Sequence, residues 1–194
     1  MPAANEDAEP LIKDERIKLI SFTGSDKVGW WIKEQSGKKK VVLELGGNAG
    51  VVVADDADLD FAVERILLGA FAVAGQSCIS VQRIIAHEKI YDRLLKSLAM
   101  RAKKLIVGDP LDPKTEVGTM VSRQAVENTM EIVRQAVKDG AKIVTGGQAR
   151  GTLMRPTILT NVKAGMDVCS KEAFAPLAVV MKYRTFKQAI DIIN

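Results

Sequence analysis

The sequence predicts an α/β fold, because segments with strand and helix patterns alternate along most of the chain. Residues 17–22 have the apolar character of a strand, residues 23–25 read Thr-Gly-Ser and form a turn, and residues 26–35 are helical. Residues 40–45 form a second apolar strand. This order predicts a parallel βαβ unit whose glycine turn presents backbone N–H groups at the positive end of a helix.

The alternation continues after Gly46-Gly47, which closes this unit. Strands are predicted over 49–53, 81–86, 141–145, 157–159 and 177–183, and helices over 59–72, 89–105, 122–139 and from 186 onward. Residues 171–176 contain a proline and are predicted to be irregular. We therefore expect a sheet that is parallel or mixed, with helices packed on it.

Composition narrows the class of protein. A chain of 194 residues with 47% hydrophobic and 27% charged residues can bury a core as one domain or two small ones. Its net charge of +4 and a single basic run at 38–40 do not suggest nucleic-acid binding. The longest apolar segment, 66–74, is too short to cross a membrane.

The acidic N-terminus, residues 1–10, lacks the apolar core of a signal peptide, so we expect a cytoplasmic, reducing location. There Cys78 and Cys169 would remain free thiols. Two cysteines and one histidine cannot by themselves supply the four ligands of a zinc site, so no metal centre is expected.

Cys78 is the first candidate for chemistry. It lies in Gly75-Gln76-Ser77-Cys78-Ile79-Ser80, a segment of small and polar residues after a predicted helix. A free cysteine often only packs as a small apolar side chain. These neighbours instead suggest a loop that folds closely around something, where a thiol could add to a carbonyl carbon.

Glu44 is the second candidate. It interrupts the apolar run Val41-Val42-Leu43-Glu44-Leu45, so in a buried strand its carboxylate would be desolvated and its pKa raised, as suits a general base. The alternative is a glutamate that faces water at the edge of a sheet. Gly46-Gly47 would allow a ligand to approach closely.

Four other residues carry weaker signals. His87, the single histidine, lies at the far end of the predicted strand from Cys78, so we expect it to be structural. Cys169 has no comparable loop and is expected to pack in the core. Glu172 and Phe174 could contact a ribose and a planar ring, although taken alone they are better explained by an ordinary loop.

Taken in order, four segments resemble the motifs of the NAD(P)-dependent aldehyde dehydrogenase superfamily. They are Phe22-Thr23-Gly24-Ser25, Glu44-Leu45-Gly46-Gly47-Asn48, Gly75-Gln76-Ser77-Cys78 and Glu172-Ala173-Phe174-Ala175-Pro176. The spacing from Glu44 to Cys78 is also similar to that of the family. The resemblance implies an aldehyde dehydrogenase-like catalytic domain over 48–194, preceded over 1–47 by the last βαβ unit of a Rossmann-like cofactor domain.

The resemblance also implies a mechanism. Cys78 would be the nucleophile that adds to an aldehyde, and Glu44 the general base for hydrolysis of the resulting thioester. Gly24 and Ser25 would lie beside the pyrophosphate of NAD or NADP, and Glu172 and Phe174 beside the nicotinamide ribose and ring. The presence of Glu44 argues against a branch that transfers the acyl group to coenzyme A.

The resemblance covers about the middle two-fifths of a family member, with Ala175 in place of a usual glycine. Most of the cofactor domain, an oxyanion-binding asparagine and the oligomerisation strands fall outside it. We therefore expect the 194-residue chain to bind NAD(P)+ poorly and to turn over aldehydes slowly. Full-length members would form homo-oligomers; the aldehyde is not specified.

Two alternatives remain open from the sequence. The chain could be an inactive remnant or interaction module that keeps the fold and binds through its exposed sheet edges. It could also be a thiol-dependent hydrolase or acyl carrier that acts without nicotinamide.

Overall fold

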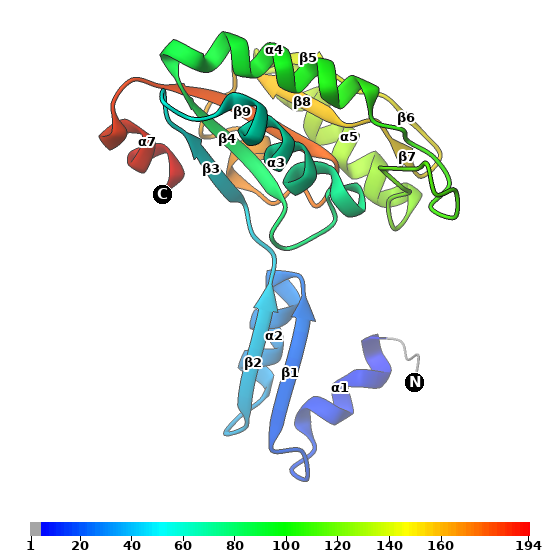
Figure 1. Ribbon diagram of the computed structural model, residues 1–194. Helices are drawn as coiled ribbons and strands as arrows, with labels where there is room; N and C mark the ends of the chain where they lie inside the picture. The colour runs from blue at the N-terminus through cyan, green and yellow to red at the C-terminus, as the bar shows by residue number, and fades with distance from the viewer. Residues whose placement is uncertain (1–4) are drawn as a thin grey trace. The chain divides into compact units, whose positions relative to one another are not determined.

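The computed structural model describes residues 5–194 (Figure 1). The chain forms two compact units, Met1–Gly46 and Gly47–Asn194, and each is described by itself. The predicted α/β class is confirmed in both units. In the described part of the chain, no helix has both the length and the apolar character needed to span a bilayer.

The first unit contains α1 (Asn5–Lys13), β1 (Leu19–Gly24), α2 (Asp26–Gln35) and β2 (Lys40–Leu45). β1 and β2 pair in parallel, which confirms the predicted βαβ unit. The Ser25 hydroxyl accepts a hydrogen bond from the Val28 N–H at 3.4 Å, so Ser25 begins α2 as its N-cap.

The second unit has a five-stranded sheet in the order β3-β4-β9-β8-β5, parallel except for the antiparallel pair β5–β8. In chain order, its strands and helices are β3 (Ala49–Val53), α3 (Leu59–Phe71), the 3-10 turn η1 (Ala72–Gly75), β4 (Val81–His87), α4 (Glu88–Lys104), α5 (Arg123–Lys138), β5 (Lys142–Thr145), β6 (Ala149–Arg150), β7 (Leu153–Met154), β8 (Thr157–Thr160), α6 (Asp167–Ser170), β9 (Leu177–Tyr183) and α7 (Phe186–Ile193). The expected mixed sheet is confirmed.

Helices cover both faces of this sheet. Adjacent residues of β4 point to opposite faces, so Ile84 packs in the main core while Ile85 packs against Tyr183 and Ala189. Helices α3 and α4 contact each other and the central strands β4 and β9, and α7 contacts β3, β4 and β9 (Figure 1). β4 therefore lies inside the sheet, between β3 and β9, and follows directly after the Cys78 loop.

The boundaries of the predicted elements lie within two residues of the sequence expectations. α1, the turn η1, the hairpin β6–β7 and the single turn α6 were not predicted. β6 and β7 have two residues each and α6 has four, so these elements are shorter than the repeat from which a pattern is read.

Candidate functional site

Cys78 lies on an exposed turn between α3 and β4. The Ser80 N–H donates to the Ser77 carbonyl oxygen at 3.0 Å, which places Cys78 and Ile79 at the two corners of the turn. The thiol is therefore presented to solvent and is not packed in the core. The packing alternative for Cys78 is wrong within this unit.

The backbone before this turn adopts an unusual conformation. Val73, Ala74 and Gly75 all have left-handed backbone angles, with φ values of 53°, 53° and 66°. Left-handed conformations are unfavourable for most residues, particularly for a β-branched side chain such as that of Val73. The strain turns the chain sharply at the end of α3 and directs it into the Cys78 loop.

Gly75 brings the Cys78 loop into contact with residues 172–176, the last of the four motif segments. A Cβ atom at Gly75 would lie 2.1 Å from the Ala175 carbonyl oxygen, so only glycine allows the two backbones to approach this closely. Phe174 has a φ of 31° and is 42% exposed. Two segments about a hundred residues apart in the sequence thus lie in direct contact.

Gly47 links these segments further. Its N–H donates to Glu172 Oε1 at 3.1 Å, and a Cβ at Gly47 would lie 3.2 Å from the Cys78 carbonyl oxygen. The Gly47 carbonyl oxygen accepts a hydrogen bond from Gln82 Nε2 at 3.0 Å. Gln82 was not singled out from the sequence; the available signal was a polar residue at a strand position that should face the core.

The three remaining candidates belong to the first unit. Gly24 and Ser25 stand where β1 ends and α2 begins, and Glu44 is opposite Thr23 on the neighbouring strand. All three lie at the carboxyl edge of the two parallel strands, which is where ligands bind in open α/β sheets.

The expected burial of Glu44 is wrong in this unit, because Glu44 is exposed. Val41, Leu43 and Leu45 are partly buried, whereas Val42 and Glu44 point the other way. Gly29 of α2 packs on Leu45, so the helix covers only that face of the strand. The face of β2 that carries Val42 and Glu44 is open to water within this unit.

The second thiol differs from Cys78. Cys169 is 6% exposed, and desolvation raises its pKa to about 11, with a smaller opposing effect of Arg83. His87 Nδ1 accepts a hydrogen bond from the Lys89 N–H, and its ring contacts Tyr183 edge-on. Both residues therefore have the structural roles expected of them, and of the two thiols only that of Cys78 is accessible.

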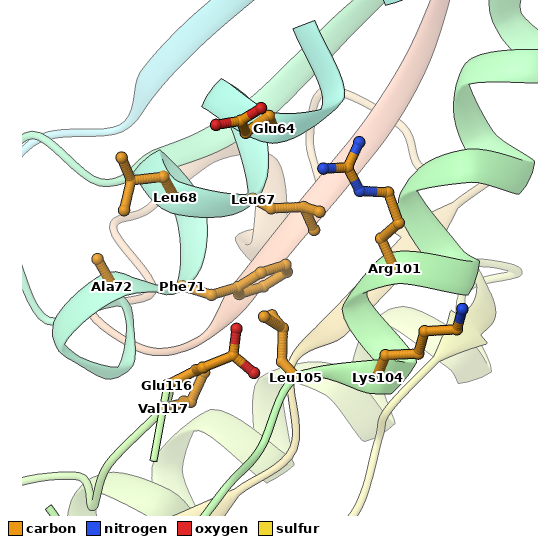
Figure 2. A pocket seen from close by; sticks show the side chains of 10 residues that line it. All are labelled: Glu64, Leu67, Leu68, Phe71, Ala72, Arg101, Lys104, Leu105, Glu116 and Val117. Carbon is orange, nitrogen blue, oxygen red and sulfur yellow. The ribbon is translucent and has the colours of Figure 1, made fainter. Parts of the chain in front are cut away.

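A separate pocket of about 520 Å³ lies where α3 and α4 face the segment around Glu116 (Figure 2). Leu67 and Phe71 point into it from α3, and Arg101 extends towards it from α4. No cysteine lines it. Among the described residues, no group of three or more His, Cys, Asp or Glu side chains is placed to hold a metal ion.

Comparison with known proteins places this geometry in a family. The model of the aldehyde dehydrogenase family matches residues 2–194. A 3-sulfolactaldehyde dehydrogenase of Priestia aryabhattai is 41% identical over 189 residues, which cover 97% of this chain and 40% of the relative.

Two solved structures give the same result. Aldehyde dehydrogenase 21 from Physcomitrella patens, in complex with the reaction product succinate, has a TM-score of 0.96 and 40% identity over 100% of this chain and 40% of that chain. The glyceraldehyde-3-phosphate dehydrogenase GapN from Methanocaldococcus jannaschii, complexed with NADP, has a TM-score of 0.92 and 39% identity. The match covers 95% of this chain and 40% of that chain. The chain thus spans about 40% of the length of the relatives it matches, and it belongs to the aldehyde dehydrogenase family.

Proposed function

We propose that the chain carries the thiol chemistry by which an aldehyde is oxidised to a carboxylic acid with NAD or NADP. The observation that carries the proposal is the exposed Cys78 on a turn that follows three left-handed residues, whereas the other thiol, Cys169, is buried. Family membership supplies the reaction class. The relatives act on different aldehydes by name, so the proposed substrate is an aldehyde of unspecified structure.

Cys78 acts as the nucleophile. Its thiolate adds to the aldehyde carbon and forms a thiohemiacetal, and loss of hydride from that carbon leaves a thioester on the sulfur. The turn at 77–80 leaves the sulfur open to an incoming carbonyl group, and the contact of Gly75 with Ala175 fixes the start of the loop. A fixed loop reduces the orientational freedom lost when the carbonyl is attacked.

Glu44 acts as the general base that activates water for hydrolysis of the thioester. Its exposure is compatible with this role, because the carboxylate must contact a water molecule. Loss of a general base typically slows the assisted step by about 10²- to 10⁴-fold. The acyl group would then remain on Cys78.

The residues present fit a dinucleotide. The turn at Gly24 and Ser25 places the N–H groups of the first turn of α2 at the end of a parallel strand, where a pyrophosphate binds favourably. Glu172 offers a carboxylate to a ribose diol, and the exposed ring of Phe174 offers a planar surface. NAD or NADP, when bound, supplies the acceptor for the hydride.

The test uses acylation of the purified chain by p-nitrophenyl acetate, followed by peptide mass spectrometry. We expect the acetyl group on Cys78 and none on Cys169, and we expect Cys78→Ala to abolish labelling while Cys169→Ala leaves it unchanged. In Glu44→Gln the acetyl-enzyme should persist about 10²-fold longer or more. Equal labelling of both thiols would refute the proposal.

A second measurement follows reduction of NAD+ and NADP+ in the presence of an aldehyde panel. We expect reduced nicotinamide to form only in chains that retain Cys78. Hydrolysis of the ester without any effect of either nucleotide would instead indicate a thiol hydrolase. Absence of acylation at Cys78 would indicate a non-enzymatic remnant.

A further inference from the structure

Gln82 is an amide buried in the core of the second unit, with only 2% of its surface exposed. It is the second residue of β4 and faces the same side of the strand as Ile84, which belongs to the main apolar core. An apolar side chain would fill this position at lower desolvation cost. The presence of an amide at this position therefore calls for a reason beyond packing.

Both ends of the amide are used. Gln82 Nε2 donates to the Gly47 carbonyl oxygen at 3.0 Å, and Gln82 Oε1 accepts from the Ala173 N–H at 2.8 Å. A carbonyl can only accept and a backbone N–H can only donate, so these partners also fix which end of the amide is nitrogen. The side chain thus joins two segments that lie 35 and 91 residues away along the chain.

A third hydrogen bond closes a ring. The Gly47 N–H donates to Glu172 Oε1 at 3.1 Å, and Glu172 is covalently joined to Ala173. Gly47 is therefore held at both its N–H and its carbonyl, by Glu172 and Gln82 respectively. Because Gly47 also approaches the Cys78 carbonyl oxygen, movement of this ring would displace the nucleophile loop.

We propose that Gln82 is a positioning residue that holds the Glu172 carboxylate at Gly47, and so sets where the cofactor ribose meets the Cys78 loop. This role rests on the proposed function, in which Glu172 contacts the ribose. Gln82 touches neither substrate nor cofactor; it acts through Gly47 and Ala173. Its loss should weaken cofactor binding while the thiol keeps its reactivity.

The first test measures amide hydrogen exchange in the full chain. In Gln82→Met, exchange of the Ala173 N–H rises because its acceptor is gone. We also expect exchange of the Gly47 N–H, which Gln82 does not bind, to rise about tenfold, the equivalent of one typical hydrogen bond. In Gln82→Glu, a carboxylate can still accept from Ala173 but cannot donate to Gly47, so only the Gly47 N–H should lose protection.

Rates are expressed relative to the Val180 N–H of β9, so that general destabilisation cancels. Thr129→Val is the matched control, because Thr129 is 3% exposed and its hydroxyl donates to the Ala125 carbonyl within α5. This control should leave the Gly47 and Ala173 ratios unchanged. An unchanged Gly47 ratio in Gln82→Met would overturn the proposal.

The second test compares NAD+ and NADP+ binding with acetylation of Cys78 by p-nitrophenyl acetate. In Gln82→Met we expect dissociation constants about tenfold higher and acetylation within about twofold of the parent chain. Acetylation that falls in step with binding would show a structural role only and would overturn the proposal. A parent chain that binds neither nucleotide would count against the proposed function, while the exchange ratios would still decide the role of Gln82.

Discussion

Replacement of Gly75 by alanine tests whether the contact between the Cys78 loop and residues 172–176 holds the site together. Any side chain at Gly75 must adopt its φ of 66°, which costs about 1–2 kcal/mol. The new Cβ would also lie 2.1 Å from the Ala175 oxygen and 2.4 Å from its carbonyl carbon. Ala175 is buried and its oxygen accepts from the Leu177 N–H at 2.7 Å, so the segment cannot move freely.

Overpacking of this kind adds about 1–3 kcal/mol, so Gly75→Ala should destabilise the second unit by about 2–5 kcal/mol in total. Gly151→Ala is the control, because Gly151 has a φ of 62° and nothing within 4 Å of its Cβ position. It should lose only the backbone part, about 1–2 kcal/mol. With a urea slope of about 2 kcal/mol/M, the two variants should differ in midpoint by about 0.5–1.5 M.

The assay must report on the second unit alone. Both tryptophans, Trp30 and Trp31, lie in the first unit, so their fluorescence follows the other part of the chain. Alkylation of the buried Cys169 thiol in a Cys78→Ala background reports unfolding of the second unit. Equal urea midpoints for Gly75→Ala and Gly151→Ala would show that the contact with Ala175 does not constrain the loop.

Three further changes have defined outcomes. The unfolded Cys169 thiol has a pKa near 9.0 and the folded one about 11, so stability is fully present below pH 9 and is lost as pH rises towards 11. Cys169→Ala should remove this decline in urea midpoint, measured in both chains by far-UV circular dichroism because the variant has no Cys169 thiol to alkylate. Arg83→Lys removes the guanidinium group, which donates hydrogen bonds to the carbonyl oxygens of Asn48, Ile192 and Ile193. This loss should lower the free energy of unfolding by about 2 kcal/mol and speed trypsin cleavage in α7. Val73→Asn should raise the urea midpoint by the equivalent of about 1 kcal/mol, since asparagine tolerates the left-handed conformation and Val73 is 74% exposed.

The sequence was sufficient to predict elements that are determined by neighbouring residues. Apolar spacing and a Ser25 N-cap determine α2, which spans Asp26–Gln35 as predicted. The motif order also identified Gly75 and Ala175, which the fold brings into contact. These features depend on residue types that are visible at fixed positions in the chain.

Features that depend on residues far away along the chain could not be predicted in this way. The partners of Gln82 are backbone atoms 35 and 91 residues away, and a backbone atom leaves no mark in the sequence. Glu44 sits in an apolar strand, yet whether its face is covered depends on which elements pack there. The left-handed angle of Val73 is imposed by the junction of α3 with the Cys78 loop, against the preference of valine itself.

The residues of the proposed site are divided between the two units, and this division separates two parts of the proposed reaction. The groups that present the thiol, from Val73 to Ser80, and the groups that brace it, Gly47, Gln82 and Glu172, all belong to the second unit. Glu44, Gly24 and Ser25 belong to the first. Capture of a carbonyl by Cys78 should therefore depend on the second unit alone, whereas release of the acyl group requires the first. Variants at Gln82 should weaken cofactor binding and leave capture nearly unchanged, whereas variants at Glu44 should slow release of the acyl group.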